Sequence, residues 1–252
     1  MIATPQEVEA SANPREYDLR TLEVGEDLPR YTEWLLEDFR PFLRGRVIEI
    51  GAGIGAIARR YVDTVDDALL VEPAPQLFDR LKESLHGRRR AHFANGTLEE
   101  VYGTTVDGIA VADGTFDTAI MVNVLEHIPD HANVLRLLFR LLKPGGALLV
   151  FVPAVPFLYG AIDARVGHVR RYTRASLSEV VHGAGFTMKT LRYFDLLGML
   201  PWLITGRLLR QSTVGSGSAK LYDQVIVPVC EAVDRVVRPR IGKNLVCVAR
   251  KP

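Results

Sequence analysis

The sequence has few of the features that mark a secreted or membrane-spanning protein. Its 252 residues include only two cysteines, Cys230 and Cys247, which cannot form a disulfide framework and favour a reducing compartment. The first twenty residues are polar and acidic and fit neither a secretory leader nor a transit peptide. The longest uncharged apolar stretch near the C-terminus, residues 196–206, is interrupted by a glycine and a proline and is too short to span a bilayer. We therefore expect a cytoplasmic protein.

A net charge of one sign is also missing. The formal net charge is +1, so no overall electrostatic argument favours nucleic acid as a partner. The charges are nevertheless uneven, because residues 1–40 sum to −6 and residues 187–252 sum to +7. An acidic head and a basic tail are compatible with mutual docking, with a basic face near an anionic substrate or membrane, or with two solvated faces.

What the sequence does contain is an alternation of strand and helix patterns. Nearly continuous apolar runs such as TAIMVNVL and ALLVFV are typical of strands buried on both faces of a parallel sheet. The alternation favours a doubly wound α/β fold. The predicted strands are 46–50, 68–72, 91–94, 116–122, 146–152, 186–193 and 243–250, and the predicted helices are 31–39, 55–64, 75–86, 131–142 and 174–184, with a loop at 154–173 and a long helical stretch at 196–240 that contains a GSGS loop at 215–218.

Three glycines follow the first predicted strand, in the stretch VIEIGAGIGAIARR at 47–60. Gly51, Gly53 and Gly55 permit positive φ and let backbone N–H groups approach a ligand without an intervening Cβ. Ligands of open parallel sheets bind beyond the carboxyl ends of the strands, and a carboxylate about 20 residues further on binds ribose hydroxyls. Glu72 stands 21 residues after Gly51. This pairing alone leaves a nicotinamide dinucleotide and an adenosyl cofactor both open.

Three further features distinguish the two cofactors. Glu49 lies two residues before the first glycine, where an anion is unfavourable beside a pyrophosphate but favourable near a sulfonium or amino group. The segment NVLEHIPD at 123–130 follows the fourth strand, and LKPGG at 142–146 precedes the fifth. Together with EIGAGIG and VEP, these segments favour the adenosyl cofactor.

These four ordered motifs resemble the class I S-adenosylmethionine-dependent methyltransferases, especially the small-molecule type 11/12 branch, over roughly residues 30–193. The resemblance implies a Rossmann-like seven-stranded sheet whose last strand, KNLVCVAR, is antiparallel, with a helical cap. The corresponding segments are an N-terminal helical lead at 1–45, a cofactor-binding core at 46–193, a helical cap and substrate region at 194–242, and the final strand at 243–252.

The resemblance also implies where S-adenosylmethionine binds. The glycine turn would hold its methionine and ribose parts, Glu72 would accept hydrogen bonds from both ribose hydroxyls, and the loop after the third strand would flank the adenine. That loop lacks the Asp found in many relatives. Tyr31 would either cover the cofactor's carboxylate or pack in the core. The predicted cofactor residues are Tyr31, Glu49, Gly51, Ala52, Gly53, Gly55, Glu72, Pro73, Gly96, Thr97, Leu98, Asn123 and Val124.

The Glu126-His127 pair is similar to part of a metal-binding segment in ubiquinone-pathway O-methyltransferases, in which another Glu stands three residues earlier. Asn123 occupies that position here, so we expect no metal. Pro129 separates His127 from His131, which excludes the helical zinc motif. His127 is then a candidate general base, because an ordinary histidine pKa of about 6.5 suits removal of a hydroxyl proton at neutral pH. The alternative is that His127 orders the site without accepting a proton.

A second cluster of polar residues occupies LYGAIDARVGHVRRYTRASL at 158–177, and similar methyltransferases share its D…GH.RRY pattern. We predict substrate contacts from Tyr159, Asp163, Arg171 and Tyr172, with His168 as a second candidate base and Arg171 as a clamp for a carboxylate or phosphate. A structural alternative pairs Asp163 with an arginine and makes Tyr172 a cap of the following helix.

The region 194–240 is rich in apolar residues, including Trp202. Such residues are usually core, but their number favours a cap over a partly apolar substrate, with Trp202 among the substrate contacts. Peripheral membrane contact and a homodimer are further possibilities.

The sequence therefore predicts S-adenosylmethionine-dependent methylation of a small, partly apolar molecule, most simply at oxygen. The alternatives are a nicotinamide-dependent oxidoreductase and a non-catalytic adenosyl-binding scaffold. Nucleic-acid methylation is disfavoured, because the tetrapeptide Asp/Asn-Pro-Pro-aromatic is missing after the fourth strand. Only the basic tail and Arg88-Arg89-Arg90 favour it.

Overall fold

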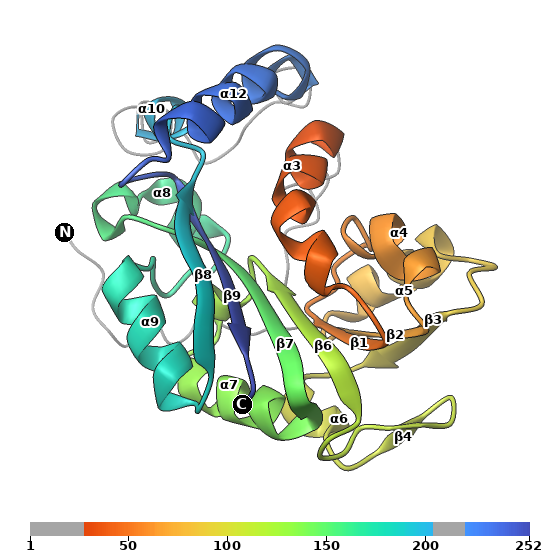
Figure 1. Ribbon diagram of the computed structural model, residues 1–252. Helices are drawn as coiled ribbons and strands as arrows, with labels where there is room; N and C mark the ends of the chain where they lie inside the picture. Colours follow the sequence, from red (N-terminus) through yellow and green to blue (C-terminus); the bar gives the residue numbers. More distant parts are fainter. Residues whose placement is uncertain (1–27, 204–219) are drawn as a thin grey trace.

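A seven-stranded mixed sheet forms the centre of the computed structural model, which describes residues 28–203 and 220–252 (Figure 1). The strand order is β3-β2-β1-β6-β7-β9-β8. β9 runs antiparallel to both of its neighbours, while the pairs from β3 to β7 are parallel. This confirms the predicted fold. The strands are β1 (Arg46–Ile50), β2 (Asp67–Glu72), β3 (Ala91–Asn95), β6 (Phe116–Val122), β7 (Leu142–Pro153), β8 (Thr187–Phe194) and β9 (Asn244–Arg250).

Both faces of the sheet are buried, because alternate residues of each strand enter two different cores. Ile48 and Ile50 of β1 join the core that contains α6 (Leu98–Val101), α7 (His131–Leu141) and α9 (Arg174–Gly183). Val47 joins the core on the other face, with α3 (Pro29–Phe39), α4 (Ala58–Tyr61), α5 (Pro75–Ser84) and α12 (Val227–Val237). The central strands are therefore apolar throughout, which is why their runs stand out in the sequence.

Several predicted boundaries differ from the structure. The helix expected at 55–64 is confined to α4 and the 3-10 turn η2 (Val62–Thr64), because residues 51–57 form the glycine turn. The loop expected at 154–173 contains η4 (Pro156–Leu158) and α8 (Ala161–Arg165), and a hairpin of β4 (Thr105–Val106) and β5 (Ile109–Ala110) was not predicted. Other short turns are η1 (Arg40–Phe42) and η3 (Leu125–His127).

The described parts of the segment after β8 are partly helical. They include α10 (Met199–Trp202), the π-helical turn η6 (Tyr222–Ile226) and α12, which lie together at one end of the sheet (Figure 1). The expected GSGS loop and the first 27 residues lie outside the described residues. Asp223 of η6 accepts hydrogen bonds from the backbone N–H groups of Arg30 (3.1 Å) and Tyr31 (3.0 Å). This carboxylate satisfies N-terminal donors of α3 and ties the cap to the leading helix.

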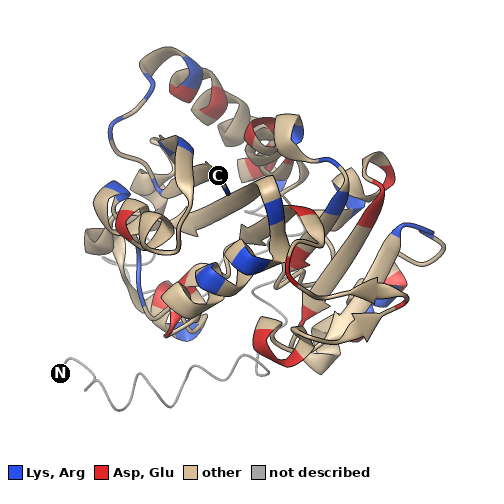
Figure 2. Cartoon of the chain, turned by 60° about the horizontal axis from the view of Figure 1, so that its bottom comes forward, with Lys and Arg blue, Asp and Glu red and all other residues tan. Residues whose placement is uncertain are grey.

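Charge pairing also joins the acidic and basic ends of the chain. Arg235 of α12 lies 2.9 Å from Glu37 of α3, and Arg192 of β8 pairs with Asp38. Acidic and basic residues are interspersed over the described chain (Figure 2). The described contacts thus support mutual docking of the two ends, although exposed pairs of this kind contribute at most about 1 kcal/mol each. None of the helices in the described ranges has the length and apolarity that crossing a bilayer would need.

Candidate active site

The three glycines of the turn after β1 have different surroundings. All three have positive φ: +67° at Gly51, +57° at Gly53 and +86° at Gly55. A Cβ at Gly51 would lie 2.4 Å from Val124 Cγ2, and one at Gly55 would lie 2.8 Å from Ser84 Oγ, so these two allow close packing. A Cβ at Gly53 would meet no atom within 4 Å. Gly53 is therefore the glycine whose missing side chain leaves open space for a ligand beside the backbone.

Glu72 closes β2 directly beside this turn. Its carboxylate is buried and accepts hydrogen bonds from the backbone N–H groups of Gly53 (2.8 Å) and Ala74 (2.9 Å), one on each oxygen. Burial raises the pKa of Glu72, and these two donors act in the opposite direction. Asn95, at the end of β3, donates to the Glu72 backbone carbonyl (2.8 Å) and links the next loop to the same edge. The sheet thus brings together groups that are 42 residues apart in the chain.

Glu49 lies on the buried strand β1 and is 2% exposed. Its carboxylate accepts a hydrogen bond from the Tyr61 hydroxyl at 2.7 Å. Burial raises the pKa of Glu49 to about 8, the Tyr61 hydrogen bond lowers it, and the nearby Glu72 raises it further. A cation near this end of β1 would favour the ionised carboxylate, whereas a pyrophosphate would be repelled by Glu49 and Glu72 together.

The residues predicted to flank an adenine differ in their contacts. Gly96 donates its N–H to the Glu72 carbonyl (3.2 Å). The Thr97 hydroxyl accepts from Glu100 N–H and caps α6 in a capping box. Leu98 is buried in the core, so its side chain packs rather than faces a ligand. Pro73, between β2 and α5, is half-buried.

The loop after β6 forms the other wall of the turn. Asn123 has a φ of +53°, which is unusual for a residue with a Cβ, and its N–H bonds to the Phe151 carbonyl (2.8 Å). The next residue, Val124, fills the space that Gly51 leaves. Ala52 is buried and its N–H is bonded to the Val71 carbonyl (3.1 Å). These contacts fix the relative position of the β1 and β6 ends.

Tyr31 has the environment of a core residue. Its ring packs edge-on against Trp34, Phe151 and Phe194. Its hydroxyl accepts a hydrogen bond from Asn244 Nδ2 at 3.2 Å. These contacts favour the packing alternative for Tyr31 over a cover for the cofactor's carboxylate.

Glu126, His127 and His168 form a buried cluster just beyond Val124. The possible ligand atoms of the three side chains all lie within 4.8 Å of one another. Glu126 is fully buried, and neither of its carboxylate oxygens has a hydrogen-bond partner in the described structure. Burial raises the pKa of Glu126 to about 7. Burial and the neighbouring His168 lower the pKa of His127 to about 3, which makes His127 a poor proton acceptor and favours the ordering alternative for it.

Asp163 orients His168 from α8. One oxygen of Asp163 lies 2.8 Å from His168 Nδ1 and 2.8 Å from Arg171 Nε, and all three side chains are largely buried. Arg171 also donates to the Ala154 carbonyl (3.0 Å) and lies under the Trp202 ring, with its Cζ 5.0 Å from the ring centroid. Asp163 is thus paired with an arginine, as the structural alternative expects, and it also fixes the orientation of a candidate base.

Tyr159 and Tyr172 differ in accessibility. The half-buried Tyr159 donates its hydroxyl to the His168 carbonyl (2.8 Å). Tyr172 is buried in the core, and its hydroxyl lies 2.6 Å from His131 Nδ1 and 3.2 Å from the Leu125 carbonyl. Tyr172 does not cap α9, because Thr173 does so through its hydroxyl.

A family model described as a methyltransferase domain matches residues 23–191, more than half of the chain. The chain belongs to this methyltransferase family. The match and the sheet topology together identify a class I S-adenosylmethionine-dependent methyltransferase. This confirms the resemblance of the four motifs and decides against a nicotinamide-dependent oxidoreductase.

Two curated relatives of the methyltransferase share no more than 30% of their residues with it over the matched regions. It is 30% identical over 142 residues to an uncharacterized methyltransferase of Mycobacterium bovis, a match that covers 56% of this chain and 49% of that protein. It is 25% identical over 185 residues to a ubiquinone biosynthesis O-methyltransferase of Xanthomonas euvesicatoria pv. vesicatoria, with coverage of 67% and 72%. The chain thus spans about half the length of the first relative.

Among solved structures, the fold is shared with Haemonchus contortus phosphoethanolamine N-methyltransferase 2 in complex with S-adenosyl-L-methionine. The TM-score is 0.58 at 19% identity, over 88% of this chain and 52% of that chain. At 19% sequence identity, this similarity shows only that the two proteins share a fold.

The glycine turn of the methyltransferase fits its cofactor, S-adenosylmethionine. Gly53 leaves room for a ligand against the backbone. The Glu72 carboxylate holds the Gly53 N–H beside this space and Glu49 lies near Glu72, so a positively charged sulfonium or ammonium group there would favour the ionised forms of both side chains.

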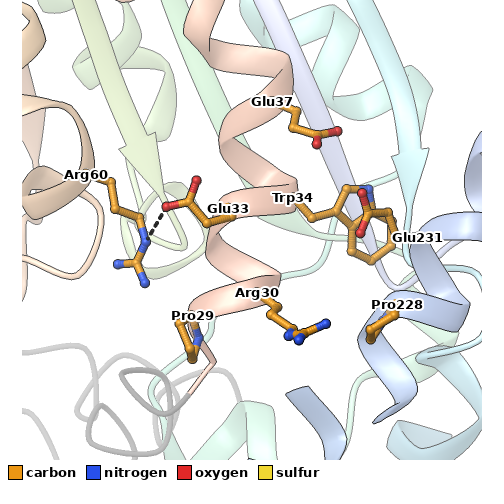
Figure 3. A pocket seen from close by; sticks show the side chains of 8 residues that line it. All are labelled: Pro29, Arg30, Glu33, Trp34, Glu37, Arg60, Pro228 and Glu231. Carbon is orange, nitrogen blue, oxygen red and sulfur yellow. Dashed lines mark ion pairs between the residues drawn. The ribbon is translucent and has the colours of Figure 1, made fainter. Parts of the chain in front are cut away.

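A separate pocket lies between α3 and α12 (Figure 3), and its lining includes none of the predicted site residues. The three carboxylates in that lining are already paired, Glu33 with Arg60 and both Glu37 and Glu231 with Arg235. The glycine turn and the cluster around Glu126 therefore remain the candidate active site.

Sequence reasoning placed Glu126 next to a candidate base but did not include it in the site of the methyltransferase. Its full burial without a hydrogen-bond partner in the described structure is the feature that distinguishes it. The signals in the sequence were its position beside His127 and the similarity of this pair to part of a metal-binding segment. The sequence made His168, 41 residues after His127, a second candidate base, but it did not indicate that His168 would lie beside Glu126 and His127.

Proposed function

We propose that this methyltransferase methylates a hydroxyl oxygen of a small, partly apolar acceptor. S-adenosylmethionine supplies a methyl group on a positively charged sulfur. A neutral hydroxyl must lose its proton to become a good nucleophile, whereas a neutral amine or an activated carbon does not require a comparable step. The observation that carries the proposal is the buried cluster of Glu126, His127 and His168, because it offers proton acceptors next to the segment that contacts the glycine turn.

The residues of the cluster have different roles in the proposed proton transfer. His127 contributes shape and polarity, since its lowered pKa keeps the ring neutral. Asp163 holds His168 by Nδ1 (2.8 Å), which directs Nε2 toward Glu126 at 3.6 Å from Oε1. This is the arrangement by which a carboxylate orients a catalytic histidine. We therefore assign the acceptor's proton to Glu126 and His168 rather than to His127.

The cap supports an acceptor with an apolar part. Trp202 of α10 lies over Arg171, and its indole Nε1 is buried with no hydrogen-bond partner among the described residues. An acceptor with both an aromatic or aliphatic portion and a polar group would suit this surrounding. The ubiquinone biosynthesis O-methyltransferase among the relatives agrees with an oxygen acceptor, at low identity.

The test is transfer of labelled methyl from S-adenosylmethionine to a panel of small hydroxylated compounds, with matched amines alongside. We expect label on hydroxyl oxygen. Glu126→Gln and His168→Ala should each lower kcat by about 10²–10⁴-fold while the Kd for S-adenosylhomocysteine stays within about twofold. His182→Asn, on the exposed face of α9, is the control and should leave kcat unchanged.

Label on nitrogen or carbon alone, or full activity in both cluster variants, would contradict the proposal. Failure of every acceptor class, with intact cofactor binding, would favour the scaffold alternative.

A membrane or dimer contact also stays a prediction. Four apolar residues in or next to η6 and α12 are each more than half exposed: Leu221, Val225, Val229 and Val236. Cosedimentation with anionic vesicles and sedimentation velocity would separate the two. If the protein neither binds the vesicles nor dimerises in the presence of cofactor, the results count against both predictions.

A further inference from the structure

The cluster of Glu126, His127 and His168 has the donor atoms of a metal site. Glu126 and His127 belong to η3, which follows β6 directly, and His168 follows α8. Their possible ligand atoms lie within 4.8 Å of one another, and the two imidazole rings stand 4.7 Å apart at 76°. Atoms bound to one zinc ion at about 2.1 Å lie roughly 3–3.5 Å apart. The 3.6 Å between His168 Nε2 and Glu126 Oε1 is already close to that separation.

Both histidines are held by their other ring nitrogen. His168 Nδ1 lies 2.8 Å from the Asp163 carboxylate, and His127 Nδ1 lies 3.3 Å from the Gly167 carbonyl. Because a carbonyl and a carboxylate accept hydrogen bonds, the Nδ1 that faces each of them acts as the donor, and a ring in its neutral form then presents its lone pair on Nε2. Metal-ligating histidines are typically oriented by just such a carboxylate or backbone carbonyl. Arg171 in turn holds Asp163 (2.8 Å).

Glu126 supplies an independent observation that points to a ligand. Its carboxylate is completely buried, and both oxygens are without hydrogen-bond partners in the described structure. Burying a carboxylate without partners is costly. A cation bound between Glu126 and the two imidazoles would compensate that cost.

We propose that Glu126, His127 and His168 bind one divalent transition-metal ion. Two imidazoles and one carboxylate suit zinc, manganese, iron(II) or cobalt better than magnesium or calcium, which prefer oxygen ligands. Three protein ligands leave at least one coordination position open. This site replaces our sequence-based expectation of no metal, because His168 provides the third ligand that Asn123 cannot.

The role of the ion rests on the proposed function. In the metal-bound form Glu126 and His168 are ligands, so the ion replaces their direct acceptance of the acceptor's proton. A hydroxyl that occupies the open position would lose its proton to solvent more readily, because the ion stabilises the resulting oxyanion. That oxygen then forms its bond to the methyl carbon as the carbon–sulfur bond breaks and S-adenosylhomocysteine leaves. The acceptor class that this chemistry favours carries a second oxygen beside the reacting hydroxyl, as catechols and α-hydroxycarbonyl compounds do, so that both oxygens can reach the ion.

The test is cobalt(II) titration of the full chain after treatment with a chelator and removal of any histidine tag. Visible d–d absorption and calorimetry should report one equivalent bound. Glu126→Gln and His168→Ala should each weaken binding by at least about 100-fold, and Asp163→Asn by about 10–100-fold because it only orients His168. His182→Asn is the matched histidine control and should bind like the wild type. Binding of S-adenosylhomocysteine verifies that each variant is folded.

Absence of binding by wild-type protein at millimolar cobalt, zinc or manganese overturns the proposal, as does equal binding by Glu126→Gln and His168→Ala. These measurements use no methyl acceptor, so they are independent of whether O-methylation is found. If metal binds in the cluster but a chelator leaves O-methylation unchanged, the catalytic role of the ion is wrong and the binding site stands.

Discussion

Replacement of Gly53 by alanine is the sharpest test of how the turn after β1 receives the cofactor. At this position the added methyl group has no protein atom within 4 Å. The substitution therefore creates no clash within the protein and places a methyl group in the open space beside Glu72. If S-adenosylmethionine lies against this backbone, the variant should bind the cofactor more weakly. The loss of affinity should be larger than the loss in unfolding free energy accounts for.

The two effects can be separated in size. A φ of +57° costs a residue that carries a Cβ about 1–2 kcal/mol, which should lower Tm by roughly 2–8 °C in a chain of this length. A methyl group forced into an occupied space costs about 1–3 kcal/mol. At about 1.4 kcal/mol per tenfold change, the Kd for S-adenosylhomocysteine should rise by about 5–150-fold.

Gly114→Ala provides the matched control. Gly114 has a φ of +68°, and a Cβ added there would likewise meet no atom within 4 Å, but this glycine precedes β6, at the end of that strand opposite the site. Calorimetry with S-adenosylhomocysteine and thermal unfolding of both variants should show similar losses of Tm and a loss of affinity in Gly53→Ala only. If Gly53→Ala binds S-adenosylhomocysteine with a Kd within twofold of the wild-type value, the proposal that the cofactor lies against the Gly53 backbone is wrong.

Three further changes follow from the buried carboxylates. Glu72→Gln keeps one acceptor oxygen for the two backbone N–H groups that the carboxylate now accepts, so we expect a loss of about 1–3 kcal/mol in unfolding free energy and weaker cofactor binding by calorimetry; unchanged values for both would contradict this. The pKa of Glu49 is raised from 4.5 to about 8 in the folded protein, so the folded state retains a proton that the unfolded state loses. The free energy of unfolding should therefore fall by about 3–5 kcal/mol as the pH rises from 4.5 through 8. Urea unfolding should show a smaller fall in Glu49→Gln, and identical pH profiles of the two proteins would count against this prediction. Lys243→Met removes the ammonium group 2.8 Å from the fully buried Asp195 and should destabilise by about 3–5 kcal/mol, a loss that the double variant with Asp195→Asn should partly restore if the pair is responsible.

Local patterns in the sequence were sufficient to place the strands of the large sheet, whereas the antiparallel last strand was implied by the family resemblance. A strand buried on both faces needs an apolar residue at nearly every position, and that requirement is visible in runs such as Leu148 to Val152. The glycine turn and Glu72 were also readable, since backbone conformation restricts the residue type and the spacing follows from one β-α-β unit. The boundaries that failed lie where tertiary contacts override local preference, as at α4, which begins only at Ala58 because the turn occupies the residues before it.

The order of the motifs along the chain determined the family, the fold and the position of the cofactor turn, because each depends on residues close together in sequence. Tertiary structure alone decided that His168 meets Glu126 and His127, that Asp163 turns a histidine toward a carboxylate, and that Tyr31 belongs to the core. The physical reason is burial. Whether a carboxylate has a partner, and whether an imidazole binds a proton or a metal, depends on groups brought together by the packing of separate elements, which no local pattern records.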